Sequence, residues 1–314
     1  MAIDILSMGE AMVEFNAAGP AAEGAAYVQG YGGDSSNVAI AAARQGASAG
    51  YMSAVGTDLF GDALLALWAR EGVDSQTVKR DPSAPTGIYF VTHGPAGHSF
   101  TYYRRGSAAS RLAPADVSER AVAGARILHA SGISQAIGET AEAAVMRAIE
   151  LAKKHRVKVS FDTNLRLQLW PIERAREVIH AAIARADIAL PGLDDARQLT
   201  GRDDADAVVD FYLGLGAPLV VLKLGDQGCL VATAAERRRV AGHAVKAVDA
   251  TGAGDAFCGA FLASVAAGDD PFAAARHANA AAALSTMGYG AVAPIPTRKE
   301  VERFLAHTRA RAAS

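Results

Sequence analysis

One short segment of the chain combines glycines with a carboxylate in a pattern suited to phosphate chemistry. Gly252, Ala253 and Gly254 are followed at once by Asp255 and by an apolar helical pattern over 254–267. Small residues leave backbone N–H groups uncovered, and a helix N-terminus favours phosphate oxygens. A carboxylate there would repel phosphate unless it accepts the proton of an attacking hydroxyl. The pattern therefore predicts an anion hole at residues 252–254 and a general base at Asp255.

The same segment also fits a purely structural role, in which Asp255 helps to cap the helix and Gly252 makes a tight turn. It is not a Walker loop, because no GxxxxGK[ST] occurs in the chain. A glycine-rich run at 288–293 superficially resembles a dinucleotide fingerprint, but Pro294 follows it and no helix opens there. The choice between the structural and the catalytic role depends on the rest of the chain.

Short apolar runs alternate with helical patterns along most of the sequence. This alternation predicts βαβ units and a parallel sheet covered by helices on both faces. The expected strands are residues 3–8, 51–55, 126–131, 157–162, 187–190 and 219–224. The expected helices are residues 36–45, 140–155, 173–185 and 254–267, with a further helix in the alanine-rich stretch 274–283.

Two stretches, about 12–32 and 86–106, break that alternation. The second reads as two strands, 87–92 and 99–104, around a turn at 94–97. Together the two stretches predict a small β-sheet, which is either a lid over an active site or an ordinary edge hairpin. We expect one domain over 1–314 that carries this small sheet.

Composition limits the classes of protein that fit. The chain has 314 residues, 51% of them apolar, and a formal net charge of −2, which argues against a nucleic-acid binder. Its two cysteines, Cys229 and Cys258, form no CxxC pair, so neither a disulfide framework nor a thiolate zinc site is expected. Without a signal-peptide pattern or a long apolar run, we expect a cytoplasmic protein with no membrane span.

Two motifs carry a resemblance to a known family. The segment 249–257 resembles the C-terminal signature of the ribokinase-like (PfkB) carbohydrate kinases, and 32–39 resembles that family's glycine motif on the substrate side. The order of elements is similar over nearly the whole chain. The resemblance implies a ribokinase-like doubly wound, mostly parallel sheet with a small β lid. It also implies ATP and Mg²⁺ as cofactors, and leaves open whether a monovalent cation is needed.

Within the family, the similarity is closest to the 2-keto-3-deoxygluconate kinase branch. The pieces that suggest it include Tyr-Tyr-Arg at 102–104 and Asn-Leu-Arg at 164–166. Both place an arginine where an acidic sugar would need one, since guanidinium binds carboxylate through two parallel hydrogen bonds. The resemblance implies that the substrate is bound by eight residues, Gly33, Asp34, Asn37, Tyr89, Tyr102, Arg104, Arg166 and Asp255. Solvated charge on a strand edge is the alternative for Arg104.

The nucleotide side carries less specific signals. The resemblance assigns it Asn164, Arg166, Lys223, Gly225, Gly228, Thr251, Gly252, Gly254 and Asn279. A polar residue on an alanine-rich helix is the alternative for Asn279. Many family members have an Asn-x-x-Glu motif linked to magnesium, but this chain has Gly192 and Asp195 at those two positions. Asp195 is therefore a candidate that would contact magnesium through water.

The expected reaction is transfer of the γ-phosphate of ATP to 2-dehydro-3-deoxy-D-gluconate, giving its 6-phosphate. A fructokinase or ribokinase type of the same family is one alternative, and a catalytically silent sugar-binding protein on the same fold is another. The expected partners are a small sugar acid and ATP, with no nucleic acid and no membrane. By analogy with the family we also expect a homodimer or larger homo-oligomer.

Overall fold

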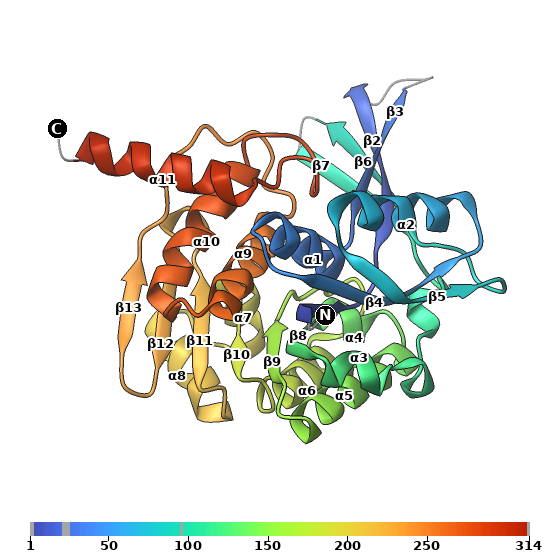
Figure 1. Ribbon diagram of the computed structural model, residues 1–314, viewed down its shortest axis with the longest axis horizontal. Helices are drawn as coiled ribbons and strands as arrows, with labels where there is room; N and C mark the ends of the chain where they lie inside the picture. Colours follow the sequence, from blue (N-terminus) through green and yellow to red (C-terminus); the bar gives the residue numbers. More distant parts are fainter. Residues whose placement is uncertain (1–2, 21–25, 95–96, 313–314) are drawn as a thin grey trace.

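The continuous apolar runs of the sequence form a large central sheet (Figure 1). The computed structural model describes residues 3–20, 26–94 and 97–312, and within them this sheet has nine strands in the order β13-β12-β11-β10-β9-β8-β1-β4-β5. Neighbours from β5 to β11 pair in parallel, whereas β12 and β13 pair antiparallel. The strands are β1 Ile3–Met8, β4 Ala49–Gly56, β5 Asp74–Asp81, β8 Ala125–Ser131, β9 Lys158–Asp162, β10 Ile188–Ala189, β11 Leu219–Lys223, β12 Cys229–Thr233 and β13 Arg237–Val240.

Helices cover both faces of this sheet and bury one apolar cluster on each (Figure 1). One group is α1 Asp34–Arg44, α2 Leu59–Glu71, α9 Ala253–Ala267, α10 Pro271–Ser285 and α11 Arg298–Ala312. The other is α3 Glu119–Ala123, α4 Gly132–Ala136, α5 Glu139–Lys154, α6 Ile172–Ile183, α7 Leu193–Thr200 and α8 Ala205–Leu215. Short 3-10 helices are Ala109–Arg111, Pro114–Asp116 and Gly225–Gln227. The predicted mostly parallel, two-faced architecture is confirmed.

A smaller sheet stands beside the central one, in the order β3-β2-β6-β7. Its strands are β2 Met12–Pro20, β3 Tyr27–Gly32, β6 Ile88–Gly94 and β7 Gly97–Tyr103, all within the two stretches that broke the alternation. Side chains alternate between its faces, so Glu14, Tyr89 and Tyr102, which are paired across the strands, lie on one face. Two residues of the predicted turn at 94–97, 95 and 96, lie outside the described residues. We call this sheet the lid.

The expected elements agree with the structure in type, and their boundaries differ from the expected ones by at most three residues. For example, the helix expected at 36–45 is α1, Asp34–Arg44, and it therefore already includes Asp34. Among the described residues, no helix is both long and apolar enough to cross a membrane. Cys229 and Cys258 are both buried free thiols, as their spacing predicted.

Helices α1 and α9 pack against each other through small side chains. Gly259 of α9 lies so close to α1 that a Cβ there would be 2.5 Å from the Cβ of Ala41 and 2.6 Å from the carbonyl oxygen of Val38. Side chains cannot occupy such distances, so the approach of the two helices requires glycine at this position. The N-termini of the two helices carry Asp34 and Asp255, so this packing sets their separation.

We predict that Gly259→Ala destabilises the protein by about 1–3 kcal/mol, because the added methyl group overpacks the α1–α9 contact. The matched control is Gly214→Ala in α8, where no described atom lies within 4 Å of the added Cβ. Alanine there should stabilise the helix by about 0.5–1 kcal/mol. Urea unfolding of both variants measures the two effects, and equal changes in unfolding free energy would contradict the packing argument.

Candidate active site

Two helix N-termini meet at the centre of the candidate site. Gly33 precedes α1 and Gly252 precedes α9, and both glycines have positive φ, 106° and 74°. From the first turn of α1, the Asn37 Nδ2 donates a hydrogen bond of 2.8 Å to the Oδ2 of Asp255 in α9. The structure thus brings together the two motifs that are more than 200 residues apart in the sequence.

The surroundings of Asp255 favour its protonated form. Removal of this carboxyl group from water raises its pKa, and the neighbouring Asp34 carboxylate raises it further. The Asn37 hydrogen bond opposes the shift, and the resulting pKa is about 7. A carboxyl group with a pKa near neutrality is suited to general-base catalysis, since it is ionised in part and still holds a proton well.

The turn before α9 is fixed by backbone contacts. A Cβ on Gly252 would lie 2.9 Å from the carbonyl oxygen of Ala291, so this position needs glycine. The Asp249 carboxylate accepts hydrogen bonds from the N–H and hydroxyl of Thr251 at 2.9 and 2.6 Å, and from the Gly290 N–H at 2.9 Å. Asp249 thus holds the two chain segments around the turn together.

The three predicted amides of the anion hole are not equivalent in this structure. The Ala253 N–H donates to the carbonyl oxygen of Ala250 at 3.2 Å, inside the turn. The first i→i−4 bond of α9 runs from the Ala256 N–H to the Gly252 oxygen at 2.8 Å. The amides of Gly254 and Asp255 precede that bond, and helix geometry directs them out of the N-terminus. The helix end therefore remains an anion site, with Gly254 as its best donor among the predicted three.

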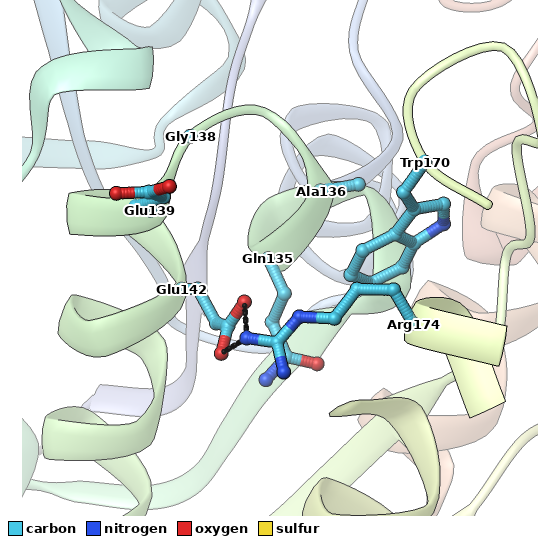
Figure 2. A pocket seen from close by; sticks show the side chains of 7 residues that line it. All are labelled: Gln135, Ala136, Gly138, Glu139, Glu142, Trp170 and Arg174. Atoms are coloured by element: carbon cyan, nitrogen blue, oxygen red, sulfur yellow. Dashed lines mark hydrogen bonds and ion pairs between the residues drawn. The ribbon is translucent and has the colours of Figure 1, made fainter. Parts of the chain in front are cut away.

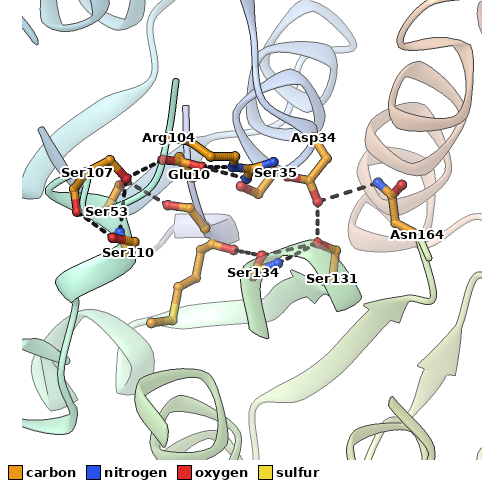
Figure 3. Close-up of polar contacts among 12 residues, drawn as sticks. Glu10, Asp34, Ser35, Ser53, Arg104, Ser107, Ser110, Ser131, Ser134 and Asn164 are labelled. Atoms are coloured by element: carbon orange, nitrogen blue, oxygen red, sulfur yellow. Dashed lines mark hydrogen bonds and ion pairs between the residues drawn. The ribbon is translucent and has the colours of Figure 1, made fainter. Parts of the chain in front are cut away.

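Asp34 is the centre of a second group of polar contacts (Figure 3). Its Oδ2 accepts a short hydrogen bond from Ser131 and a longer one, 3.5 Å, from the Asn164 Nδ2. Its Oδ1 is buried and has no partner among the described residues. Burial raises the pKa of this carboxyl group. Asp34 can therefore accept a hydrogen bond from a ligand hydroxyl, whereas Asn164, expected on the nucleotide side, has its amide turned to Asp34.

Arg104 is held by a carboxylate that sequence reasoning missed, Glu10. The Arg104 Nε donates to the Glu10 Oε2 at 2.7 Å, and Nη2 lies 2.5 Å from the same oxygen. The other Glu10 oxygen accepts a hydrogen bond of 2.5 Å from the Ser107 hydroxyl (Figure 3). The Glu10 side chain is fully buried and that of Arg104 is 11% exposed. Arg104 is thus an enclosed, oriented group, and not solvated charge on a strand edge.

The lid places two tyrosines against this arginine. The Tyr89 hydroxyl donates a short hydrogen bond to Glu14, and its ring stacks on Tyr102 with centroids 5.6 Å apart. Arg104 lies over the Tyr102 ring at 5.8 Å. Burial raises the pKa of Tyr102, while the positive charges of Arg166 and Arg104 oppose that shift. These side chains therefore share one region, although Tyr89 is buried and already engaged by Glu14.

Lys223 is an ion-pair partner and not an open ligand group in this structure. It ends β11, and its Nζ lies 2.5 Å from the Oδ2 of Asp162, which ends β9. The Cys258 thiol lies 3.5 Å from the same Nζ and 3.4 Å from Asp162. Burial alone would lower the pKa of Lys223, but the charge of Asp162 raises it above its ordinary value. A Cβ on Gly254 would be only 3.7 Å from Nζ, so this cation lies directly beneath the anion hole.

The remaining nucleotide-side residues have structural roles in this conformation. Gly228 has φ 92°, and a Cβ there would lie 2.1 Å from the Val240 carbonyl oxygen. Gly225 also has positive φ, 64°. Asn279 is buried, and its Nδ2 donates to the carbonyl oxygens of Val240 and Ala241 at 3.0 and 3.1 Å. Asn279 therefore braces the end of β13 and the residue that follows it in this structure.

Asp195 fits a supporting role towards magnesium. Its Oδ2 accepts a hydrogen bond of 3.0 Å from the Leu165 N–H, and burial raises its pKa. Within the described residues, no group of three His, Cys, Asp or Glu side chains could hold a metal ion. Mg²⁺ commonly binds through one or two carboxylates together with substrate phosphates and waters. Asp195 is therefore the predicted carboxylate that would hold Mg²⁺, directly or through water, with phosphates and waters as the other ligands.

The carboxyl ends of the parallel strands explain why these groups converge. Ser131, Asp162 and Lys223 are the last residues of β8, β9 and β11, and the carboxyl ends of such strands form the usual ligand-binding edge of an open α/β sheet. The positions of Asp162 and Lys223 after apolar strands were visible in the sequence, but their pairing was not. Glu10 lies two residues after the end of β1, and its position could have been found by the same signal.

Comparisons with known proteins identify the family. The sequence matches the pfkB family of carbohydrate kinases over residues 2–298. It is 35% identical over 310 residues to a 2-dehydro-3-deoxygluconokinase of Thermoproteus tenax, covering 96% of this chain and 94% of the relative. It is 36% identical over 318 residues to fructokinase-1 of Oryza sativa subsp. japonica, covering 96% and 97%. A fructokinase from Xylella fastidiosa with bound ATP matches in structure with a TM-score of 0.89 at 26% identity, covering 98% and 100%.

These matches, together with the fold and the helix-end site, define a carbohydrate kinase. The chain belongs to the pfkB family.

The pKa of Asp255 leads to a prediction about pH. As the predicted base, Asp255 must be ionised to act, so kcat/KM for an accepted sugar should rise with pH through about 7. The Lys223 charge lowers the pKa of Asp255, so Lys223→Met should move this midpoint to higher pH. Lys223→Arg keeps the charge and should keep the midpoint. A pH–rate profile measured on all three proteins tests this, and an unchanged midpoint in Lys223→Met would contradict it.

Proposed function

We propose that this protein transfers the γ-phosphate of ATP to the 6-hydroxyl of 2-dehydro-3-deoxy-D-gluconate, with Asp255 as the catalytic base. The observation that carries the proposal is the Asp255 carboxylate, held by Asn37 at the N-terminus of α9 and shifted to a pKa of about 7. The similarity to a 2-dehydro-3-deoxygluconokinase supports this substrate, and the similarity to a structure with bound ATP supports the nucleotide.

The proposed chemistry follows from what each group can do. Asp255 accepts the proton of the sugar hydroxyl as the oxygen attacks the γ-phosphorus. The bond from that phosphorus to the ADP oxygen breaks, and ADP leaves. The α9 N-terminus, with the Gly254 N–H and the nearby Lys223 charge, stabilises the negative charge on the transferred group. Magnesium, when bound, would neutralise the nucleotide phosphates, with Asp195 as the protein carboxylate available to it.

The geometry around Arg104 favours a substrate that carries a carboxylate. A guanidinium has five N–H donors, and Glu10 engages the edge formed by Nε and Nη2. The other edge retains the fork geometry that binds a carboxylate through two hydrogen bonds. Tyr102 beside it and Asp34 deeper in the site would then receive the rest of the sugar.

A fructokinase is the second candidate, because relatives with that name are as similar as the 2-dehydro-3-deoxygluconokinases. It would use the same base and the same anion site. The two proposals differ in whether a charged group must face Arg104, so they predict different responses to its removal.

The lid is also proposed to pair two copies of the chain. Val28 and Phe100 lie on the lid face that carries Tyr89 and are 62% and 39% exposed, whereas Tyr27 and Tyr103 lie on the opposite face and are 43% and 63% exposed. Exposed apolar side chains gathered on one small sheet are typical of an association surface. A homodimer formed there would cover them.

We predict that Asp255→Ala lowers kcat about 100- to 10,000-fold, the usual contribution of a positioned general base. The affinity for ATP should stay nearly unchanged, since the base contacts the acceptor and not the nucleotide. Coupled detection of ADP gives the rate, and calorimetry gives the affinity. Asp194→Ala is the matched control, because that side chain is 93% exposed. Near-normal turnover of Asp255→Ala would rule out its assigned role.

We predict that Arg104→Ala lowers kcat/KM for the sugar acid about 10- to 100-fold, since it removes a charge-assisted hydrogen-bonding pair. The kcat/KM values for fructose and ribose, measured on the same protein preparation, should fall far less. Retained activity with these neutral sugars would show that the variant is folded. The same panel with wild-type protein ranks the acceptors. Equal losses on acidic and neutral sugars would remove the carboxylate argument, and fructose as the best acceptor would favour a fructokinase. Sugar binding without ADP release from any acceptor would indicate a silent binding protein.

A further inference from the structure

Glu10 lies where all four strands of the lid join the main domain. It precedes β2 by two residues, and its carbonyl oxygen leaves no room for a Cβ on Gly33, the residue after β3. A Cβ on Gly87, the residue before β6, would lie 2.8 Å from the Glu10 Oε1. Arg104, the residue after β7, donates from its Nε to the Glu10 Oε2 at 2.7 Å. The base of the lid is therefore packed around this one residue.

The Glu10 carboxylate is enclosed, so it can affect a ligand only through its neighbours. Its side chain is 0% exposed, and its oxygens accept hydrogen bonds from Arg104 and from the Ser107 hydroxyl (Figure 3). Arg104, in contrast, keeps part of its side chain exposed and lies over the Tyr102 ring. Any effect of Glu10 on a bound sugar is therefore transmitted by the Arg104 guanidinium.

Glu10 reduces the electrostatic effect of Arg104 on the site. Burial raises the pKa of Asp34 and of Tyr102, and the Arg104 charge is among the effects that oppose both shifts, so this charge reaches the sugar side. An adjacent carboxylate converts the single charge into an ion pair, whose field falls off faster with distance than that of a lone cation. A carboxylate on the sugar is therefore attracted less strongly than it would be by Arg104 alone.

Glu10 also fixes the direction in which Arg104 presents its donors. The carboxylate engages Nε and Nη2. Because a guanidinium is planar and rigid, these contacts set the orientation of its other N–H groups. A fixed fork of donors favours a carboxylate, which can accept two parallel hydrogen bonds, over a single hydroxyl. Orientation thus helps an acidic sugar to bind, whereas the reduced net charge hinders it.

We propose that Glu10 is a positioning residue that sets the preference between acidic and neutral sugars, by orienting Arg104 while limiting its net charge. This role rests on the proposed function, in which Arg104 contacts the sugar. Both effects act on a carboxylate much more than on a hydroxyl, so they change the ratio of the specificities for the two kinds of sugar. A residue needed only for folding would leave that ratio unchanged.

Two conservative substitutions separate charge from orientation. Glu10→Gln keeps the size and an acceptor for Arg104, and its amide can donate to the Ser107 hydroxyl, but the negative charge is lost. The ratio of kcat/KM for 2-dehydro-3-deoxy-D-gluconate to that for fructose should therefore rise about 10-fold. Glu10→Asp keeps the charge but is one methylene shorter, so Arg104 loses its fixed orientation. The same ratio should then fall about 5-fold.

Glu142→Gln is the matched control, because it removes the same charge from a different arginine–glutamate pair. The Arg174 Nη2 donates to both Glu142 oxygens at 2.7 and 2.9 Å, at a pocket between α4, α5 and α6 (Figure 2). This variant should keep the wild-type ratio. Dissociation constants from calorimetry give the same ratio without depending on turnover, and thermal unfolding shows whether each variant is folded. Either Glu10 variant alone tests the proposal, since each has its own expected direction.

An unchanged ratio in a folded Glu10 variant would overturn the proposal, and so would a ratio that moves in the same direction in both variants. The wild-type ratio tests the proposed function separately. Fructose as the preferred acceptor of the wild type would contradict the sugar-acid substrate, whereas a rise of the ratio in Glu10→Gln would still support the role of Glu10.

Discussion

The contact between the N-termini of α1 and α9 is the constraint on which the rest of the site depends. It joins Asn37 to Asp255 by one hydrogen bond, and it requires the two helices to approach closely through Gly259. The approach places Asp34 and Asp255 near each other, and the repulsion between their charges helps to raise the pKa of Asp255 towards neutrality. Packing between small residues in the core thereby determines the acid–base property of a side chain at the surface of the site.

The charges around Asp255 form a balanced set. Asp34 and Asp162 favour its protonated form, whereas Lys223 and the Asn37 hydrogen bond favour the ionised form. Lys223 can remain charged while buried because Asp162 lies 2.5 Å away. The pair therefore keeps a cation near the N-terminal end of α9, where it would support an incoming phosphate in the proposed reaction. Lys223 lies in a segment that resembles nucleotide-binding segments, yet its contact in this structure is the Asp162 carboxylate. The need of a buried lysine for a counter-charge explains this contact.

Much of the fold could be predicted from the sequence because its signals are local. Buried parallel strands are continuously apolar, helices have a period near 3.6, and the lid interrupted that alternation at 12–32 and 86–106. Asp255 could be predicted because glycines that open a helix have a recognisable spacing, and Asn37 because its segment resembles a motif of a known family. The roles of Glu10 and Asp162 could not, since each depends on a partner that is distant in the sequence. A carboxylate after a strand is visible in the sequence, but its partner is determined only by the order of strands in the sheet.

The Glu10–Arg104 pair shows why similarity to relatives does not by itself decide the substrate. A guanidinium enclosed at 11% exposure would be costly without a counter-charge, and the buried Glu10 carboxylate supplies one before any ligand arrives. Arg104 is therefore stable in the empty site and needs no acidic sugar for that purpose. In the proposed reaction, the carboxylate of a sugar acid would be the second carboxylate at this guanidinium, and the Ser107 hydroxyl would still donate a hydrogen bond to Glu10. With a neutral sugar, Glu10 and Arg104 can remain as they are. The difference in binding free energy between an acidic and a neutral sugar would determine which substrate is preferred. That difference depends on how Arg104 is shared between Glu10 and the carboxylate of the sugar.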